Sequence, residues 1–385
     1  MRKIYLFYIC VMAILFFGFK GVYAAPVISS GSGTASDGQN FIIGGSGFGT
    51  NSLSKVEWLG GEDGNIEQGV TGQDFKKDGW SNNASSPVKY SEIQAHSGSK
   101  SIMSQWPSTS RSSGYFYDTG ISGVGKIYVT WWAYFDHVDS AGQWKKWRLR
   151  SDSNVNDSDG EIYENNWYTN TGSGSSSQFY IYCDLENYVQ CYPNSDSAYK
   201  SIEVQQIDKW VRVELYAEES SDDGLRDGTV QLYRHTQTSA VTKLKDFDGT
   251  AITRATNVNN RWRYFIFQNY WGNNSGGTGT KEKAYIDDIF IQVGTQARVE
   301  IGDNSTWANC KHREIQIPVS WTSNKIEFTF NRGSFMGGVV YLYVVDADGN
   351  VSDNDTATTG AQGYPVIVNS TSSVNLPGAP NLSVE

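Results

Sequence analysis

The chain has 385 residues, which is more than a single β-sandwich needs, and this length predicts two domains. Its formal net charge of −10 excludes the broad basic surface of a nucleic-acid-binding protein. Aromatic residues make up 14% of the chain, and 40 glycines punctuate short runs rich in Val, Ile, Tyr and Phe. No stretch keeps a helical period over several turns. The composition therefore predicts an all-β protein built of antiparallel strands.

The N-terminus has the pattern of a secretory signal peptide. Arg2 and Lys3 precede an apolar run that reaches Phe19, and small residues surround Ala24. We expect cleavage after Ala24, which removes residues 1–24 with their three cations and changes the net charge from −10 to −13. The alternative is a retained membrane anchor, for which the run is a little short. No later apolar stretch is long enough to cross a bilayer, so the mature chain is expected to be secreted or held at the cell surface without a transmembrane segment.

Two distant segments together have the pattern of one small sandwich. The first runs from Pro26 to the bend Gly45-Ser-Gly-Phe-Gly49 and resembles the opening half of an IPT/TIG domain, an immunoglobulin-like sandwich. The strands at 315–330, 340–352 and 364–368 resemble its closing half. The resemblance implies a split domain made of residues 25–60 and 296–370, followed by a flexible tail, 371–385. The alternative is an independent C-terminal sandwich with a short N-terminal appendage.

The segment between these halves, residues 61–295, predicts a larger sandwich. Its expected strands lie at 126–135, 144–150, 178–183, 210–217, 229–233, 263–270 and 284–291. Their spacing and alternation are typical of a two-sheet antiparallel jelly roll. The motifs Lys209-Trp-Val-Arg-Val-Glu214, Asp227-Gly-Thr-Val-Gln-Leu-Tyr233 and Tyr285-Ile-Asp-Asp-Ile289 resemble the concanavalin A-like lectin/glucanase superfamily, which includes laminin G modules and several polysaccharide lyases. That resemblance implies a concave sheet face that holds carbohydrate.

A cationic strand stands out in this segment. In Trp144-Lys-Lys-Trp-Arg-Leu-Arg150, alternation predicts that Lys146, Arg148 and Arg150 share one face and that Trp147 and Leu149 enter the core. The stretch from 210 to 216 repeats the pattern, with valines and a leucine on its apolar side. We expect the two strands side by side in one sheet, with the charged side chains on the concave face.

That face defines the candidate carbohydrate-binding residues. They are Trp132, Tyr134, Lys146, Arg148, Arg150, Arg212, Glu214 and Tyr216. Arginine suits bidentate capture of a uronate carboxylate or a sulfate, which favours an acidic polysaccharide or cell-surface glycan as the partner. In the alternative reading, these charges neutralise cross-strand neighbours and the aromatic rings are packing.

Catalysis is an open question from the sequence. In a polysaccharide lyase, Arg148 or Arg150 with Gln268 would neutralise the uronate, and Tyr270 or His137 would move protons. The Gln-Ile-His strand motif of alginate lyases with this fold is missing. A glycoside hydrolase is less favoured, because Tyr216 occupies the place of the central Asp in the Glu-x-Asp-x-x-Glu pattern.

Two further features concern metals and cysteines. Asp287 and Asp288 stand where relatives of the jelly roll often bind calcium, the only cofactor that the sequence suggests. Cys183 and Cys191 flank a short polar segment, and export would permit a disulfide between them. The alternative is that the cysteines are small packing residues.

These observations predict an exported carbohydrate-binding or cell-surface protein that binds a polysaccharide on the concave face of a jelly roll. The first alternative is a polysaccharide lyase that acts on a uronate-containing glycan. The second is a structural or adhesion surface protein that binds no sugar.

Overall fold

The structure is a computed structural model of the chain. It describes residues 24–60, 66–82, 87–105, 116–119, 121, 124–136, 142–150, 166–171, 179–184, 208–254, 262–273, 283–355 and 357–369, with the side chains of 142–145, 166–171, 179–184 and 268–273 left out. The predicted signal peptide and the predicted tail lie outside these residues, apart from Ala24. In the described part of the chain, no helix has the length and apolar character needed to cross a bilayer.

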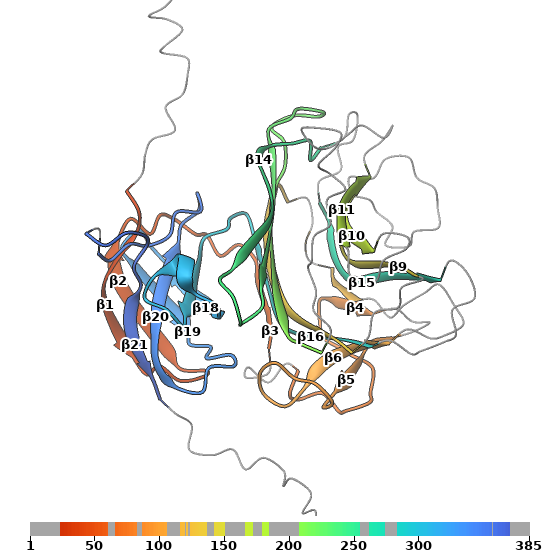
Figure 1. The fold of residues 1–385 in the computed structure, drawn as a ribbon, viewed down its shortest axis with the longest axis horizontal. Coiled ribbons are helices and arrows are strands. Elements are labelled where there is room, and N and C mark those ends of the chain that lie inside the picture. The colour runs from red at the N-terminus through yellow and green to blue at the C-terminus, as the bar shows by residue number, and fades with distance from the viewer. Residues whose placement is uncertain are drawn as a thin grey trace, which may run out of the picture.

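Seven strands form the smaller sandwich, shown at the left of Figure 1. In spatial order they are β1 (Val27–Gly33), β2 (Asn40–Ser46), β19 (Lys325–Thr329), β18 (Arg313–Trp321), β17 (Arg298–Gly302), β20 (Gly338–Val345) and β21 (Tyr364–Val368). The first half of β18 pairs with β17 and its second half pairs with β19, so this strand connects the two layers.

Strands from the two predicted segments of this sandwich pair with each other. Strand β2 pairs with β19, which sets Phe41 opposite Phe328. Ile43 and Ile326 are opposite each other in the same pairing and are fully buried. A Cβ on Gly45 would stand 1.9 Å from the carbonyl oxygen of Val27, which explains why a glycine lies at this close crossing of β1 and β2. Residues from both predicted segments therefore share one core.

The larger sandwich consists of two sheets. One contains β14 (Thr242–Ala251), β13 (Gly228–His235), β12 (Val211–Glu218), β8 (Lys126–Phe135), β16 (Lys283–Val293), β6 (Ser101–Gln105) and β5 (Lys89–Ser91), with β3 (Val56–Leu59) also paired to β16. The other contains β11 (Phe179–Asp184), β10 (Asn166–Thr171), β9 (Gly142–Arg150), β15 (Tyr264–Asn273), β7 (Phe116–Asp118) and β4 (Trp80–Asn82). The antiparallel pairing and the two stacked sheets agree with the predicted all-β jelly-roll class.

Strand β3 corrects one predicted boundary. The sequence predicts that residues 25–60 belong to the small sandwich, but Val56–Leu59 pairs with β16 of the larger sandwich. Leu59 is buried in the core of that larger sandwich, whereas Trp58 faces the small one. The chain has therefore left the small sandwich before Val56.

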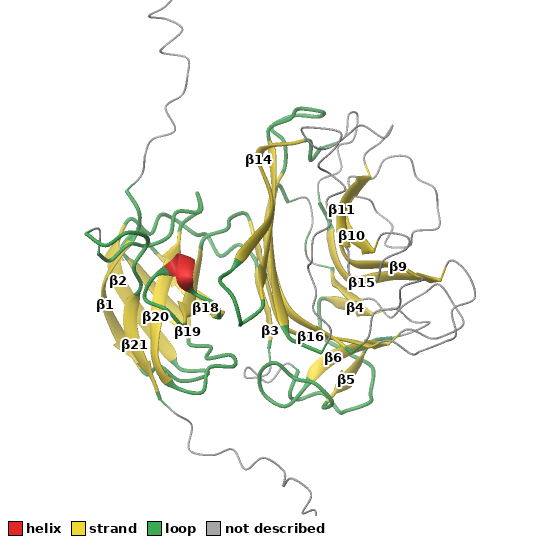
Figure 2. Ribbon diagram, viewed as in Figure 1, coloured by secondary structure: helices red, strands yellow, loops and turns green. Residues whose placement is uncertain are grey.

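The small sandwich covers the outer face of the eight-stranded sheet, so the molecule has its layers in the order small sandwich, eight-stranded sheet, six-stranded sheet (Figures 1 and 2). Alternation along β12 explains the contact. Val211, Val213 and Leu215 enter the core between the two sheets of the larger sandwich, as predicted. Tyr216 points the other way and packs with Ile315 of the small sandwich in a separate cluster.

Candidate functional site

The two charged strands lie in different sheets. Strand β9 belongs to the six-stranded sheet and β12 to the eight-stranded sheet, so the expectation that they lie side by side is wrong. Trp147 and Leu149 of β9 share a core with Val213 of β12. The alternate residues on each strand consequently leave this core on opposite sides of the sandwich. Alternation places the apolar residues of each strand correctly, but it carries no information about which strands are neighbours.

The cations of β9 form no exposed row. Arg148 lies opposite Ile266 of β15, on the face away from the core, but Arg148 is 1% exposed and Arg150 is 0% exposed. Lys146 departs from the alternation, because the register of β9 against β10 shifts between Lys145 and Arg148. Its ammonium group lies 3.8 Å from the ring centroid of Phe135, a residue of the core. The three side chains therefore line no open concave trough in this structure.

The residues proposed for lyase chemistry are only partly placed. Tyr270 of β15 lies opposite Lys145 of β9, and Gln268 falls in a register irregularity of the same strand. Their side chains are outside the described set, and His137 lies outside the described residues altogether. Cys191 is likewise not described, nor is the side chain of Cys183, so the predicted disulfide stays a prediction.

The charged side chains of β12 are enclosed between the two sandwiches. Arg212 donates from Nη1 to a carboxylate oxygen of Glu300 at 3.0 Å and to the carbonyl oxygen of Arg313 at 2.7 Å. Arg212 and Glu214 are each 1% exposed. The expectation that they face solvent on a concave surface is wrong, because the small sandwich covers this face of the sheet.

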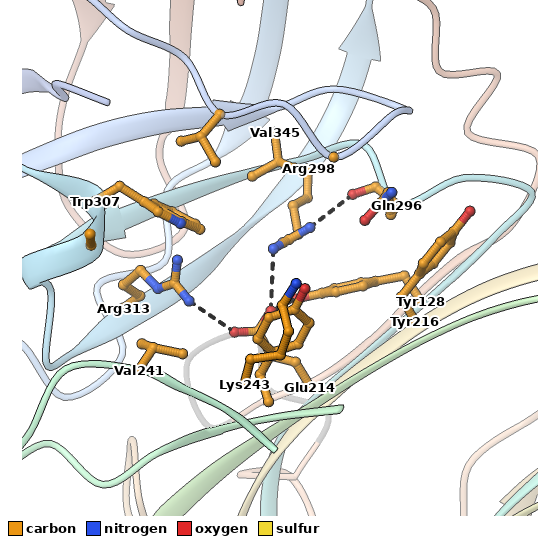
Figure 3. Close-up of a pocket in the computed structure, with 14 residues that line it drawn as sticks. Tyr128, Glu214, Tyr216, Val241, Lys243, Gln296, Arg298, Trp307, Arg313 and Val345 are labelled. Carbon is orange, nitrogen blue, oxygen red and sulfur yellow. Dashed lines mark hydrogen bonds and ion pairs between the residues drawn. The ribbon is translucent and has the colours of Figure 1, made fainter. Parts of the chain in front are cut away.

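Glu214 is the centre of this interdomain network. Its carboxylate accepts hydrogen bonds from the Tyr128 hydroxyl at 2.7 Å, from Arg298 at 3.3 Å and from Arg313 at 3.3 Å. His235 also contacts it. Figure 3 shows the two arginines of the small sandwich reaching Glu214 from the opposite wall.

The protonation states follow from burial and from these neighbours. Burial alone would raise the pKa of Glu214, but Arg212, His235 and Arg298 together outweigh burial and hold the pKa well below its usual range. Burial likewise acts to raise the pKa of Glu300, and Arg212 is again the strongest opposing group, so the pKa falls to about 2. Burial lowers the pKa of His235 to about 4 against the pull of the Glu214 carboxylate. At neutral pH, the network therefore holds the guanidinium ions of Arg212, Arg298 and Arg313 against the two carboxylates.

A pocket of about 300 Å³ opens beside this network, between the two sandwiches. Its floor consists of the buried side chains of Tyr128, Glu214, Arg298 and Arg313. Its mouth is more exposed and is lined by Tyr233, Lys243, Gln296, Trp307 and Ala308. Figure 3 shows most of these side chains around the same space.

Arg313 is held in the pocket by stacking as well as by charge. Its guanidinium carbon lies 3.4 Å from the ring centroid of Trp307, close enough for a cation–π contact. Its Nη2 reaches Glu214, whereas its Nη1 has no hydrogen-bond partner among the residues that the structure describes. An unsatisfied buried donor costs about 1–3 kcal/mol.

Three other predicted residues surround the same interface. Tyr216 lines the pocket, and its hydroxyl donates to Glu218 at 2.9 Å. The Trp132 indole donates to Glu314 at 3.1 Å and is 1% exposed. Tyr134 is half-buried, and its hydroxyl donates to Asp208 at 3.3 Å. Of the eight predicted carbohydrate-binding residues, only Glu214 and Tyr216 line the pocket.

The predicted calcium residues hold a loop. Asp287 accepts hydrogen bonds from the backbone amides of His96 at 2.8 Å and Ser97 at 3.3 Å. Asp288 contacts His96 Nδ1 at 2.7 Å and accepts from the Ser97 hydroxyl at 2.6 Å. Burial and the adjacent Asp288 carboxylate raise the pKa of Asp287 well above its usual range. The two carboxylates thus fix the position of residues 96 and 97, and calcium binding stays a prediction.

The contribution of the small sandwich to the pocket does not follow from any long-range pattern in the sequence. Arg298, Trp307 and Arg313 come from three places in one segment, and no periodicity links them to β12. The usable signal was the alternation of Arg298 and Glu300 with apolar Val299 and Ile301 on one short strand, which leaves charged groups on the face opposite a core.

Comparisons with known proteins find likeness only at the level of structure. No family model matches the chain, and no curated protein matches it. The alginate lyase Aly36B in complex with an alginate trisaccharide is 13% identical and gives a TM-score of 0.42 over 63% of this chain and 100% of its own. The cellulose-induced protein Cip1 gives 14% identity and a TM-score of 0.39 over 59% and 94% of the two chains. The alginate lyase vAL-1 from Chlorella virus is 12% identical and gives a TM-score of 0.38 over 62% of this chain and 99% of its own. Likeness this weak carries no conclusion about activity.

Proposed function

We propose that the protein is an exported carbohydrate-binding protein whose interdomain pocket binds an acidic residue of a polysaccharide. The observation that carries the proposal is the composition of the pocket. Arg298 and Arg313 lie in its floor, and Trp307 and Tyr233 lie at its mouth. This replaces the concave face of the jelly roll, on which the sequence analysis placed the ligand, because the cations there are enclosed.

The charge balance favours an anion. Of the buried charged groups that line the pocket, the guanidinium groups of Arg298 and Arg313 outnumber the carboxylate of Glu214, which leaves one positive charge at its floor. A uronate carboxylate or a sulfate would offset this charge. Lys243, at the mouth, adds a further cation, although it is paired with Asp246 at 2.8 Å.

The aromatic mouth favours a sugar over a small inorganic anion. The side chains of Trp307 and Tyr233 are half-buried at the entrance; Arg313 occupies one face of the Trp307 ring, and the remaining exposed aromatic surface is suited to contact with a pyranose ring. Pockets of small-molecule sites begin near 300 Å³, so the volume suits one sugar residue with the rest of the polymer outside. Export rests on the N-terminal pattern, and a mature protein that begins at Ala25 would support it.

The test uses the mature chain and a panel of oligosaccharides. Calorimetric titration should detect binding of uronate-containing or sulfated oligosaccharides and much weaker binding of neutral ones. Lys243→Ala combined with Tyr233→Ala should weaken the binding roughly tenfold, because one charge and one stacking surface are lost. Lys325→Ala, an exposed lysine on β19 that does not line the pocket, is the matched control and should bind normally. Equal binding by the double variant would exclude the pocket.

A polysaccharide lyase is the second candidate. Backbone pairing supports it, because Tyr270 lies opposite Lys145, three residues along β9 from Arg148. Ultraviolet absorbance of the unsaturated uronate, followed after mixing with acidic polysaccharides, separates the candidates. A steady rise that Arg148→Gln abolishes and Lys243→Ala spares would establish a lyase site on the six-stranded sheet. Binding without product would support the pocket alone, and absence of both would leave a structural surface protein.

A further inference from the structure

A second polar cluster lies at the same domain boundary and is separate from the pocket. It contains His96 from the loop before β6, with His312 and Glu314 at the start of β18 in the small sandwich. None of these residues lines the pocket. One ligand atom from each side chain lies within 4.8 Å of the other two. Two imidazole nitrogens and one carboxylate oxygen are a donor set typical of zinc sites.

The distances suit a small tetrahedral ion. Ligands bonded to zinc at 2.0–2.1 Å are separated from one another by about 3.4 Å. His96 Nε2 is 3.7 Å from Glu314 Oε1, which needs almost no movement. His312 Nε2 is 2.5 Å from the same oxygen, where the ring donates a hydrogen bond to it. A bound metal would lengthen this distance by about 1 Å, and the ring proton of His312 would move to Nδ1.

The surrounding contacts orient the two buried ligands. The Nδ1 of His96 lies 2.7 Å from Asp288 Oδ2. A carboxylate can only accept, so Nδ1 carries the ring proton and the lone pair of Nε2 faces the cluster. The Trp132 indole donates to Glu314 Oε2 at 3.1 Å and leaves Oε1 toward the histidines. A carboxylate behind a ligating histidine is the usual outer-sphere arrangement in zinc proteins.

Irregular backbone brings Asp288 to this position. The register of β16 shifts between Asp287 and Phe290, and Asp288 has a φ of 47°. In a regular strand, consecutive side chains would point to opposite faces, whereas here both carboxylates contact the loop at residues 96 and 97. The bulge thus directs the second carboxylate onto the ring of His96.

The space for a fourth ligand is bordered by polar groups. The side-chain amide of Gln237 is 3.2 Å from His96 Nε2 and 3.3 Å from the Ser334 hydroxyl. That hydroxyl is in turn 3.2 Å from His312 Nε2. The nitrogen and oxygen of an amide are interchangeable by rotation, so Gln237 can present its oxygen to a metal.

We propose that His96, His312 and Glu314 form a zinc site that links the two sandwiches, with Asp288 as the positioning residue of His96. Gln237 or a water molecule completes the coordination. The site joins one loop and one hairpin of the larger sandwich to β18 of the small one, so the ion fixes one domain against the other. This site is independent of the proposed sugar pocket and needs no catalytic activity.

The experiment measures metal binding directly. The mature chain is treated with a chelator, dialysed and titrated with ZnCl₂ by calorimetry, and with CoCl₂ by visible absorption. We expect one zinc per chain and the intense visible bands of tetrahedral cobalt. His312→Asn should lower zinc affinity at least 100-fold and remove the cobalt bands. Asp288→Asn should lower the affinity 10- to 100-fold, the usual effect of losing an outer-sphere carboxylate.

Controls separate metal binding from folding. Lys311→Ala changes an exposed neighbour of His312 and should leave zinc binding unchanged. Asn suits the positive φ at position 288, so Asp288→Asn should fold, and circular dichroism of each metal-free variant checks this. If a variant fails to fold, Glu314→Gln serves in its place. Absence of stoichiometric zinc in the folded wild-type chain would overturn the proposal, as would unchanged zinc affinity and cobalt bands in folded His312→Asn.

Discussion

Strands β9 and β12 have nearly the same pattern but lie in different surroundings. Each alternates apolar with charged residues, and each sends its apolar half into the one core of the larger sandwich. The charged half of β12 meets the small sandwich, where Arg212 and Glu214 find partners on the opposite wall. Strand β9 lies in the other sheet, and Lys146 turns back toward the core at a register shift.

The difference shows what an alternating pattern can and cannot specify. It identifies the side chains that leave a core, because period two follows from strand geometry. It does not identify what lies over that face. For β12, the covering residues come from β17 and β18, which follow much later in the chain. A charged row is therefore equally compatible with a ligand-binding surface and with a domain interface.

Of the substitutions that test this difference between β9 and β12, removal of Arg212 should cause the largest loss of stability. Arg212→Ala removes the 3.0 Å ion pair with Glu300 and the hydrogen bonds to the Thr130 hydroxyl and the Arg313 carbonyl, while Arg298 keeps its contact with Glu300, and should lower the free energy of unfolding by about 3–5 kcal/mol. Urea denaturation followed by tryptophan fluorescence measures the change. A loss below about 1 kcal/mol would mean that water reaches the network and that β12 lies on an open face.

Acidification should act through His235. Burial keeps the folded pKa near 4, whereas the unfolded side chain titrates near 6.5. Between these values the unfolded state binds more protons, so the free energy of unfolding should fall as the pH drops from 6.5 to 4, by at most about 3 kcal/mol. Glu214, Arg212 and Arg313 are the charged groups that face the ring.

Thermal unfolding across this pH range checks the prediction. Burial also lowers the pKa of His96 to about 4, so His96 destabilises the fold over the same pH range. His235→Gln should therefore remove only part of the dependence of stability on pH. A variant with the wild-type slope would show that His235 is not the titrating group.

Removing the Tyr128 hydroxyl, which contacts Glu214, should cause a smaller loss of stability. Tyr128→Phe removes the 2.7 Å hydrogen bond to Glu214 and keeps the ring under the guanidinium of Arg298. We expect a loss of about 2 kcal/mol, within the range for hydrogen bonds to charged groups. Guanidinium chloride denaturation gives the value, and a neutral outcome would mean that a water molecule replaces the hydroxyl.

The smallest change in the free energy of unfolding is expected at the solvent-exposed ends of β8 and β12. Lys126 and Glu218 form a 2.7 Å ion pair, but their side chains are 44% and 35% exposed. Lys126→Ala should therefore change the free energy of unfolding by less than about 1 kcal/mol, and the change should vanish in high salt. A loss as large as that for Arg212→Ala would remove the distinction between covered and open parts of the face.

The fold was largely predictable from the sequence, because strand periodicity and turn residues are local signals. Alternation placed Trp147 and Val213 in the core, and the structure agrees. The boundary after the first two strands was not predictable, since Val56–Leu59 reads as a generic strand and only its pairing with β16 assigns it. The site was less predictable still. Arg298 and Arg313 reach Glu214 only through the packing of one sandwich on the other.

The pairing of β2 with β19 also sets an order of events as the chain is made. On the ribosome, β1 and β2 emerge early, and their partner emerges only after the whole larger sandwich has been synthesised. Closing so long a loop carries an entropic cost, which a jelly roll already folded in between would reduce by bringing its two ends together. Until then, the edge of β2 has no partner strand. Synthesis therefore leaves a hairpin that a chaperone or a second nascent chain can meet before its own β19 does.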